Sequence, residues 1–297
     1  MKKLILLTMM FVFLVVAGNA QNPKWTVYNT TNSGLSGNSV LAIAIDDNGS
    51  KWIGTQNNGL VKYDGTNWTV YNTSNSDIPI NWVNTIVIGP NGDKWIGTGW
   101  GGVAKFDGNN WTVYDESNSD LPDNGVETLA KDGNGNIWIG TNLGIAKFDG
   151  TDLTSYDPSN SDYPDTTETY SIAIDNNNNL WFGTRDEDID ILNGAGVVKF
   201  DGGSNWTFYD ASNCDLPLNM VFSVAVDDNG DVWAFTFYAG LAKFDGNSWT
   251  VYDESNSDLP EDDIRALTID SDGDKWIGTR GRNSGMAKFD GQSDWTI

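Results

Sequence analysis

The residues best suited to chemistry in this sequence are its few arginines, all in the second half of the chain. They are Arg185, Arg265, Arg280 and Arg282. A guanidinium group binds a carboxylate through two parallel hydrogen bonds, so a cluster of arginines can clamp an acidic group. Together with Glu127, Tyr170 and the acidic residues of the segment 185–193, such a cluster could support a carboxylate-based hydrolase of the sialidase or glycosidase kind.

Other catalytic groups are scarce. The chain has no histidine, which excludes Ser-His-Asp and Cys-His catalysis, a histidine general base and zinc held by histidine. Its one cysteine, Cys214, cannot form a disulfide within the chain. The net charge of −24 repels phosphate backbones and anionic lipid surfaces, so we expect no nucleic acid or membrane partner. These exclusions favour a protein that is not an enzyme.

An acidic insertion at 185–193 is the weak candidate for a metal site. Its Asp186, Asp188 and Asp190 alternate as oxygen ligands of calcium would. The rest of a calcium loop is missing, because Ile191 stands where the turn glycine should be. The Asp-rich turns of the repeats described below are a second candidate, although such turns are common in hairpins. We expect a solvated acidic loop and no cofactor, with calcium as the alternative.

Aromatic residues outside any repeated pattern favour a ligand site. Exposed Trp and Tyr give a large contact area at low entropic cost, which suits sugar rings and peptides. We therefore predict a glycan, peptide or protein ligand. The predicted ligand-binding residues are Trp82, Trp100, Glu127, Tyr170, Arg185, Phe237, Tyr238, Arg265 and Arg280.

The elements that position these residues are short strands. The stretch 94–114 reads as three of them, Lys94–Thr98, 102–106 and Trp111–Tyr114, and Val83–Ile88 is a fourth just upstream. Each strand is rich in aromatic or β-branched residues, and the breaks hold Gly, Asn or Asp. Four antiparallel strands in one unit make a small sheet.

A tryptophan on the second strand marks six copies of this unit. It recurs at Trp52, Trp95, Trp138, Trp181, Trp233 and Trp276, in steps of 43, 43, 43, 52 and 43 residues. A period of about 40–50 residues with four strands per unit is the signature of a β-propeller. We expect an all-β propeller of six four-stranded antiparallel blades in one domain over 21–297, with each Trp in a seam between blades.

The count of last strands leaves closure of the ring open. Seven such strands are predicted for six first strands. Either residues 25–28 complete the last blade and close the ring, or the chain is part of a longer array, with a partial seven-bladed ring as the alternative. The linkers between blades carry a Leu-Pro pair, such as Leu121 and Pro122, which we expect to anchor them.

Differences between the copies indicate a face for the ligand. The first strands vary one residue from their start, at Leu41, Asn84, Glu127, Tyr170, Phe222 and Arg265. The loops after the second strands vary too, and Trp82 and Tyr163 lie in the linkers beside them. Propeller topology brings these segments to one face and the uniform turns to the other. We predict the ligand site on the variable face.

The pattern D-x-N-G-x-K-W-I-G-T, followed by G-[GL]-[VA]-x-K-[FY]-D-G-x-x-W-T-x-Y, resembles the two-component-regulator propeller repeat over nearly all of the chain after residue 22. In sensor proteins with such repeats the propeller is the extracellular ligand-sensing part, and the repeats are common in secreted proteins of Bacteroidetes-type bacteria. The resemblance implies a binding module. A purely structural surface protein is a further alternative.

The first residues resemble a secretory signal. Lys2 and Lys3 precede an apolar run, and the small residues at 18–20 fit a cleavage site. We predict a signal peptide over 1–20, cleaved after Ala20, and a secreted, periplasmic or cell-surface location.

Overall fold

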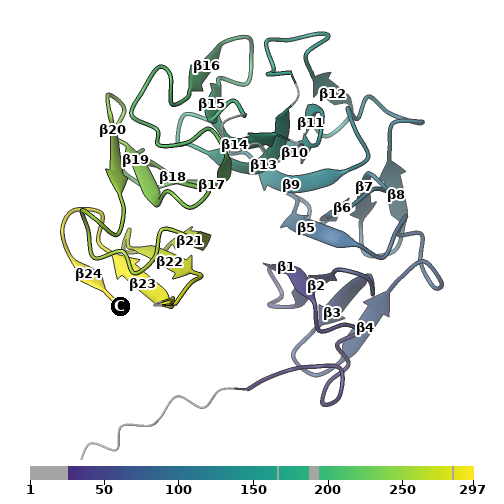
Figure 1. The fold of residues 1–297 in the computed structure, drawn as a ribbon. Coiled ribbons are helices and arrows are strands. Elements are labelled where there is room, and N and C mark those ends of the chain that lie inside the picture. Colours follow the sequence, from purple (N-terminus) through teal and green to yellow (C-terminus); the bar gives the residue numbers. More distant parts are fainter. Residues whose placement is uncertain (1–25, 166, 187–193, 283) are drawn as a thin grey trace, which may run out of the picture.

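The computed structural model describes residues 26–165, 167–186, 194–282 and 284–297. Within these ranges the chain forms six antiparallel sheets of four strands each and no helix, so none is long and apolar enough to cross a membrane (Figure 1). In every sheet the strands follow one another in chain order, and the first strand lies innermost. The predicted six-bladed, all-β propeller is confirmed.

The strands fall into four equivalent sets. The innermost are β1 (Val40–Ile45), β5 (Val83–Ile88), β9 (Val126–Lys131), β13 (Thr167–Ile174), β17 (Val221–Val226) and β21 (Ile264–Ile269). The second are β2 (Lys51–Thr55), β6 (Lys94–Thr98), β10 (Ile137–Thr141), β14 (Leu180–Asp186), β18 (Val232–Thr236) and β22 (Lys275–Thr279). The third are β3 (Leu60–Tyr63), β7 (Val103–Phe106), β11 (Gly144–Phe148), β15 (Val197–Phe200), β19 (Leu241–Phe244) and β23 (Met286–Phe289). The outermost are β4 (Trp68–Tyr71), β8 (Trp111–Tyr114), β12 (Leu153–Tyr156), β16 (Trp206–Tyr209), β20 (Trp249–Tyr252) and β24 (Trp295–Thr296).

An aspartate organises the turn between the first two strands in five of the six blades. In the third blade, Asp132 accepts hydrogen bonds from the backbone amides of Asn134 and Asn136 at 2.9 Å, and from the indole Nε1 of Trp138 at 3.0 Å. Burial alone would raise the pKa of Asp132, but a hydrogen bond from the Asn136 side chain, together with those from Trp138 and the backbone, lowers it. The turn carboxylates that were a calcium candidate therefore bind the turn and the tryptophan ring.

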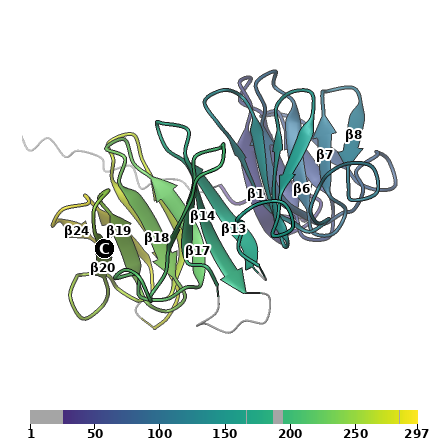
Figure 2. The same ribbon diagram turned by 90° about the horizontal axis from the view of Figure 1, so that it is seen from above.

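Tryptophan rings fill the five seams between neighbouring blades, as predicted, whereas Trp276 of the sixth blade is half-buried and has no described blade beside it. Trp138 is 1% exposed, and its ring contacts Phe200 of the next blade edge-on, with 6.0 Å between ring centroids. Figure 2 shows the sheets standing side by side around the arc. The equivalent pairs are Trp52 with Phe106, Trp95 with Phe148, Trp181 with Phe244, and Trp233 with Phe289. Each seam thus buries one large aromatic ring on each side.

The linkers are anchored by one apolar side chain each. Leu121, Leu216 and Leu259 are 2–4% exposed, which confirms the predicted anchor. The linker before the fourth blade uses Tyr163 at this position. Tyr163 is buried, and its hydroxyl donates to the backbone oxygen of Thr167 at 3.0 Å. Burial raises the pKa of Tyr163 to about 12. Tyr163 therefore lies in the linker beside the variable loops, as predicted, but it is a buried anchor and not an exposed ring.

The six blades form an arc that is open between the sixth and the first (Figure 1). No described strand of the sixth blade packs on the first blade as neighbouring blades pack on each other. On β1, the side chains of Ile43 and Ile45 are 64% and 61% exposed. In the second blade a Cβ added to Gly97 would lie 2.6 Å from Val126 of the next blade, whereas one added to Gly278 would meet only its own blade. Among the described residues, both ends of the arc therefore lack a neighbouring blade.

The hypothesis that residues 25–28 complete the last blade is wrong for the part that the structure describes. The sixth blade forms its own fourth strand, in which Trp295 pairs with Phe289. Residues 26–28 form no strand, and Tyr28 packs on Tyr63 and Trp68 of the first blade at 5.6 and 5.5 Å between ring centroids. Trp25 and the predicted signal peptide lie outside the described residues.

Candidate ligand-binding site

Every innermost strand contains an irregularity at the same position. The pairing of β13 with β14 passes from Thr169 to Ser171 and skips Tyr170, and the other five blades skip the equivalent residue. A bulge of this kind takes one residue out of the ladder and redirects its side chain. The skipped residues are Leu41, Asn84, Glu127, Tyr170, Phe222 and Arg265. They are also the first-strand residues that differ between repeats.

The variable segments meet at one end of the blades, as predicted. The backbone amide of Gly99, after β6, donates to the oxygen of Trp82, just before β5, at 3.1 Å. The same bond joins Phe237 to Met220 at 3.1 Å and Arg280 to Asp263 at 2.8 Å. We call this end, with the six bulge residues and the loops after the second strands, the variable face.

In the fourth blade an arginine is held between an acid and a ring. The guanidinium of Arg185 lies 4.3 Å from the ring centroid of Tyr170 and forms an ion pair with Glu168, a buried residue. Arg185 and Asp186 were expected in a loop, but β14 extends through both because they pair with Glu168 and Thr167 on β13. The stacked guanidinium is fixed beside the bulge residue.

A second arginine group joins the fifth and sixth blades. The carboxylate of Asp263, of which 8% is exposed, binds Arg265 Nη2 at 2.8 Å and Arg280 Nε at 2.9 Å. Arg280 Nη2 also donates to the hydroxyl of Tyr238 at 2.8 Å. The Arg265 guanidinium lies 5.8 Å from the centroid of the Tyr238 ring. These contacts raise the pKa of Arg280, with the bond to Asp263 as the largest cause.

The loop after β18 is strained. Tyr238 has a φ of 53°, a left-handed conformation that costs a residue other than glycine roughly 1–3 kcal/mol. The preceding Thr236 hydroxyl is buried without a hydrogen-bond partner among the described residues. In the second blade the equivalent hydroxyl, on Thr98, donates to the oxygen of Gly102 at 2.7 Å. Strain of this kind gathers at binding and catalytic sites.

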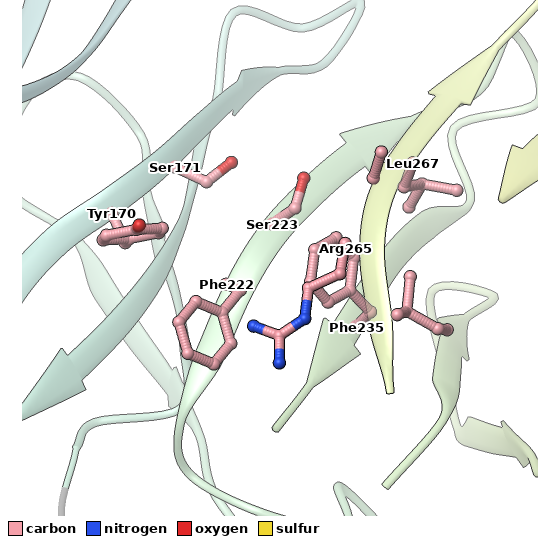
Figure 3. Close-up of a pocket in the computed structure, with 9 residues that line it drawn as sticks. Tyr170, Ser171, Phe222, Ser223, Phe235, Arg265 and Leu267 are labelled. Atoms are coloured by element: carbon pink, nitrogen blue, oxygen red, sulfur yellow. The ribbon is translucent and has the colours of Figure 1, made fainter. Parts of the chain in front are cut away.

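Aromatic rings connect the two arginine groups. Tyr170 meets Phe222 edge-on at 5.4 Å, Phe222 meets Phe237 at 5.6 Å, and Phe237 meets Tyr238 at 4.3 Å between ring centroids. A cavity of about 400 Å³ opens beside this row, and Tyr170, Phe222 and Arg265 project around it from three neighbouring strands (Figure 3). This size is within the usual range for small-ligand pockets. Six of the predicted residues therefore lie close together with Phe222 in the fourth to sixth blades. They are Tyr170, Arg185, Phe237, Tyr238, Arg265 and Arg280.

Glu127 belongs to the neighbouring third blade. Burial raises the pKa of its carboxyl group, while the charge of Arg185 partly opposes this shift. It is the bulge residue of β9, so it stands next along the row of innermost strands from Tyr170. A carboxyl group with a raised pKa is a candidate proton donor.

The two predicted tryptophans of the second blade lie apart from this group. Trp82 is half-buried over Gly99, and its indole Nε1 donates to the side-chain oxygen of Asn84 at 2.6 Å. Trp100 is 65% exposed on the following loop. Trp82 therefore has a structural role beside the bulge, and Trp100 alone offers a free ring.

The acids that hold the arginines were missed by the sequence prediction. Glu168 stands 17 residues before Arg185, and Asp263 stands 17 residues before Arg280. This matched spacing in two repeats is the signal that could have found them. Of the predicted metal ligands, Asp188 and Asp190 lie outside the described residues. Within the described ranges, no group of three or more His, Cys, Asp or Glu side chains could hold a metal ion.

Known proteins share this architecture. The solved extracellular domain of a putative hybrid two-component system from B. thetaiotaomicron has a TM-score of 0.71 and 23% identity over 91% of this chain and 36% of that one. This chain thus spans about a third of the length of that relative. A catalytically inactive histidine-to-alanine variant of virginiamycin B lyase from Staphylococcus aureus, solved with quinupristin, has a TM-score of 0.68 and 14% identity over 87% and 83% of the two chains.

An ancestral GH74 enzyme has a TM-score of 0.65 and 19% identity, over 89% of this chain and 41% of that one. At these identities the likenesses establish the fold alone. No curated protein matches the chain by sequence. The sequence profile described as two component regulator propeller matches residues 120–143 and 162–186, in the third and fourth blades. The chain is therefore a β-propeller whose third and fourth blades contain segments that match the two component regulator propeller repeat.

Proposed function

We propose that this protein is an extracellular recognition protein that binds a glycan or a peptide on its variable face. One observation carries the proposal. In every blade the innermost-strand residue that the bulge releases from the sheet is also the residue whose side-chain type differs most between repeats. A repeat needs uniform side chains to pack, so variation at a redirected position indicates recognition.

The fourth to sixth blades are the best place for the ligand. They combine a row of aromatic rings, three arginines and a strained loop, and Tyr170, Phe222 and Arg265 of these blades line one cavity. Aromatic rings supply contact area, and arginines supply directed hydrogen bonds. The extracellular location is supported by the signal-like sequence at 1–20 and by the extracellular domain that shares the fold.

Two double variants test the proposal once a glycan and peptide array has given a ligand. Trp100→Ala with Tyr238→Ala removes rings from the variable face, and Asn48→Ala with Asn229→Ala changes exposed turns at the other end. A well-packed aromatic contact is worth about 2 kcal/mol or more, roughly thirtyfold in affinity. We expect the first variant to lose at least this much and the second to bind like the parent. The reverse result would place the site on the turn face.

A hydrolase is the second candidate, because Glu127 has the raised pKa that a general acid in glycoside cleavage needs. A panel of fluorogenic glycosides, including sialosides, tests it. Turnover that is lost in both Glu127→Gln and Arg265→Ala would favour the enzyme, and no turnover across the panel would favour binding alone. Chemistry like that of the lyase is not supported: the lyase variant without its histidine is inactive, and this chain has no histidine.

A further inference from the structure

We propose that the cavity beside Arg265 binds a ligand with a single carboxylate attached to a ring, with the carboxylate on Arg265 and the ring against Phe222 and Tyr170. This inference rests on the proposed function for its location and adds the chemical class of the ligand.

The first support is the separation of arginine from lysine in the fold. The lysines of the third strands pack against the repeated tryptophans, with their Nζ atoms 4.9–5.5 Å from the ring centroids. None of the four arginines occupies such a position: Arg265 is the bulge residue of the sixth blade, and Arg185 and Arg280 lie near the bulge residues of the fourth and sixth blades. Lysine therefore serves the scaffold, whereas arginine is kept for the variable face. Arginine is the side chain that matches a carboxylate with a planar fork of donors.

The second support is the charge around Asp263. One buried carboxylate faces two guanidinium groups, so the group of Asp263, Arg265 and Arg280 keeps one positive charge. Both contacts of Arg265 with Asp263 use Nη2. Among the described residues, Nη1 and Nε of Arg265 have no hydrogen-bond partner. The Nη1 amino group and the net positive charge of this group therefore suit one carboxylate.

The third support is the lining of the cavity. Its walls are the Tyr170 and Phe222 rings, the Phe235 ring, the Ser171 and Ser223 side chains and short apolar groups. Arg265 is the one charged residue among the lining residues, in a chain whose net charge is −24. The single guanidinium group among otherwise uncharged lining residues attracts an anion, and the aromatic side chains provide surfaces against which a ligand ring can pack (Figure 3).

These features also limit the charge of the ligand. A second negative charge would enter the pocket without a partner, and an unpaired charge in a partly buried site is costly. A phosphate monoester is therefore disfavoured relative to a carboxylate. An acidic sugar and an aromatic acid both present a single carboxylate on a ring, and the experiment separates them.

The experiment is calorimetric titration of the protein with matched probes. Glucuronate is paired with glucose, phenylacetate with 2-phenylethanol, and phenyl phosphate supplies the dianion. We expect one or both carboxylates to bind at least tenfold more tightly than their neutral partners and than phenyl phosphate. A roughly tenfold difference in affinity is what one hydrogen bond to a charged group contributes. Glucuronate binding alone identifies an acidic sugar, and phenylacetate binding alone identifies an aromatic acid.

Two variants locate the contact. Arg265→Gln removes the guanidinium from the cavity and should weaken carboxylate binding roughly tenfold to a hundredfold. Arg282→Gln removes the same charge from a residue that does not line the cavity, and it should bind the probes like the parent. Arg265→Lys, which keeps the charge but loses the fork, should fall between them.

Three outcomes overturn the inference: equal binding of acids and neutral partners, equal losses in Arg265→Gln and Arg282→Gln, or no binding of any carboxylate at millimolar concentration. These failures are distinct from failure of the proposed function. An array ligand that still depends on Trp100 and Tyr238 would keep the variable face as the site while removing the carboxylate from it.

Discussion

At the scale of the residue, Tyr238 differs from every other aromatic side chain of the described chain. Its backbone is left-handed, its hydroxyl accepts from Arg280, and its ring is 52% exposed. The packing energy of a fully buried ring can offset backbone strain, but about half of the Tyr238 side chain is exposed to solvent. The strain is therefore better explained by the position that it gives the ring on the variable face.

Replacing Tyr238 by glycine should separate stability from binding. Glycine adopts a positive φ without steric cost, so Tyr238→Gly should leave the free energy of unfolding within about 1 kcal/mol or raise it. Affinity for the variable-face ligand should fall about tenfold or more. Thermal unfolding and titration measure the two effects. A loss of stability well above that limit would show that the ring holds the fold.

The carboxyl group of Glu127 predicts a pH dependence. Burial raises its pKa in the folded protein, so folding favours the protonated form. Its contribution is most favourable below about pH 4, near the ordinary glutamate pKa, and is lost as the pH rises through the raised pKa. Glu127→Gln should therefore be more stable than the parent at pH 7 and equal to it in acid. Melting temperatures across this range check the sign, and a parent that is more stable at pH 7 would contradict it.

At the scale of the element, the strands were largely predictable and the bulges were not. Five of the six innermost strands begin one residue before their varying residue, as predicted, because the 43-residue period fixes each strand by its copies. The exception is β13 in the fourth blade, which starts earlier, at Thr167, because Glu168 pairs with Arg185 across the hairpin. A bulge is a mismatch between two strands, and neither strand alone reveals it. The varying residues marked the place without its cause.

The seam tryptophans predict an uneven cost of truncation. Trp138 is 1% exposed between two blades, so Trp138→Ala should cost about 3–5 kcal/mol. Trp276 bonds Asp270 at 2.7 Å but is only half-buried at the open end of the arc, so Trp276→Ala should cost well under half as much. Chemical unfolding of both variants measures the difference. Equal costs would mean that the sixth blade has a neighbour in solution.

At the scale of the whole molecule, the candidate site was predicted in part. The topology of a propeller brings the linkers between blades and the loops after the second strands to one face, so the position of the variable face could be predicted from the strand pattern. The grouping of Tyr170, Phe222 and Arg265 around one cavity did not, because it depends on how far each blade is rotated from the last. The contact that holds Trp82, with Asn84, was not predicted for a related reason: Asn84 lies two residues away on a bulge.

Over the described residues, the open arc is a linear chain of blades and not a closed ring. In such an array each unit is held only by its immediate neighbours, so the end units fray first and the central units last. The cavity lies between β13, β17 and β21, and so reaches from the interior of the array to its terminal blade. A ligand held there would tie the loosest unit to a firmer one. Ligand binding at this cavity would then slow the local unfolding of the sixth blade.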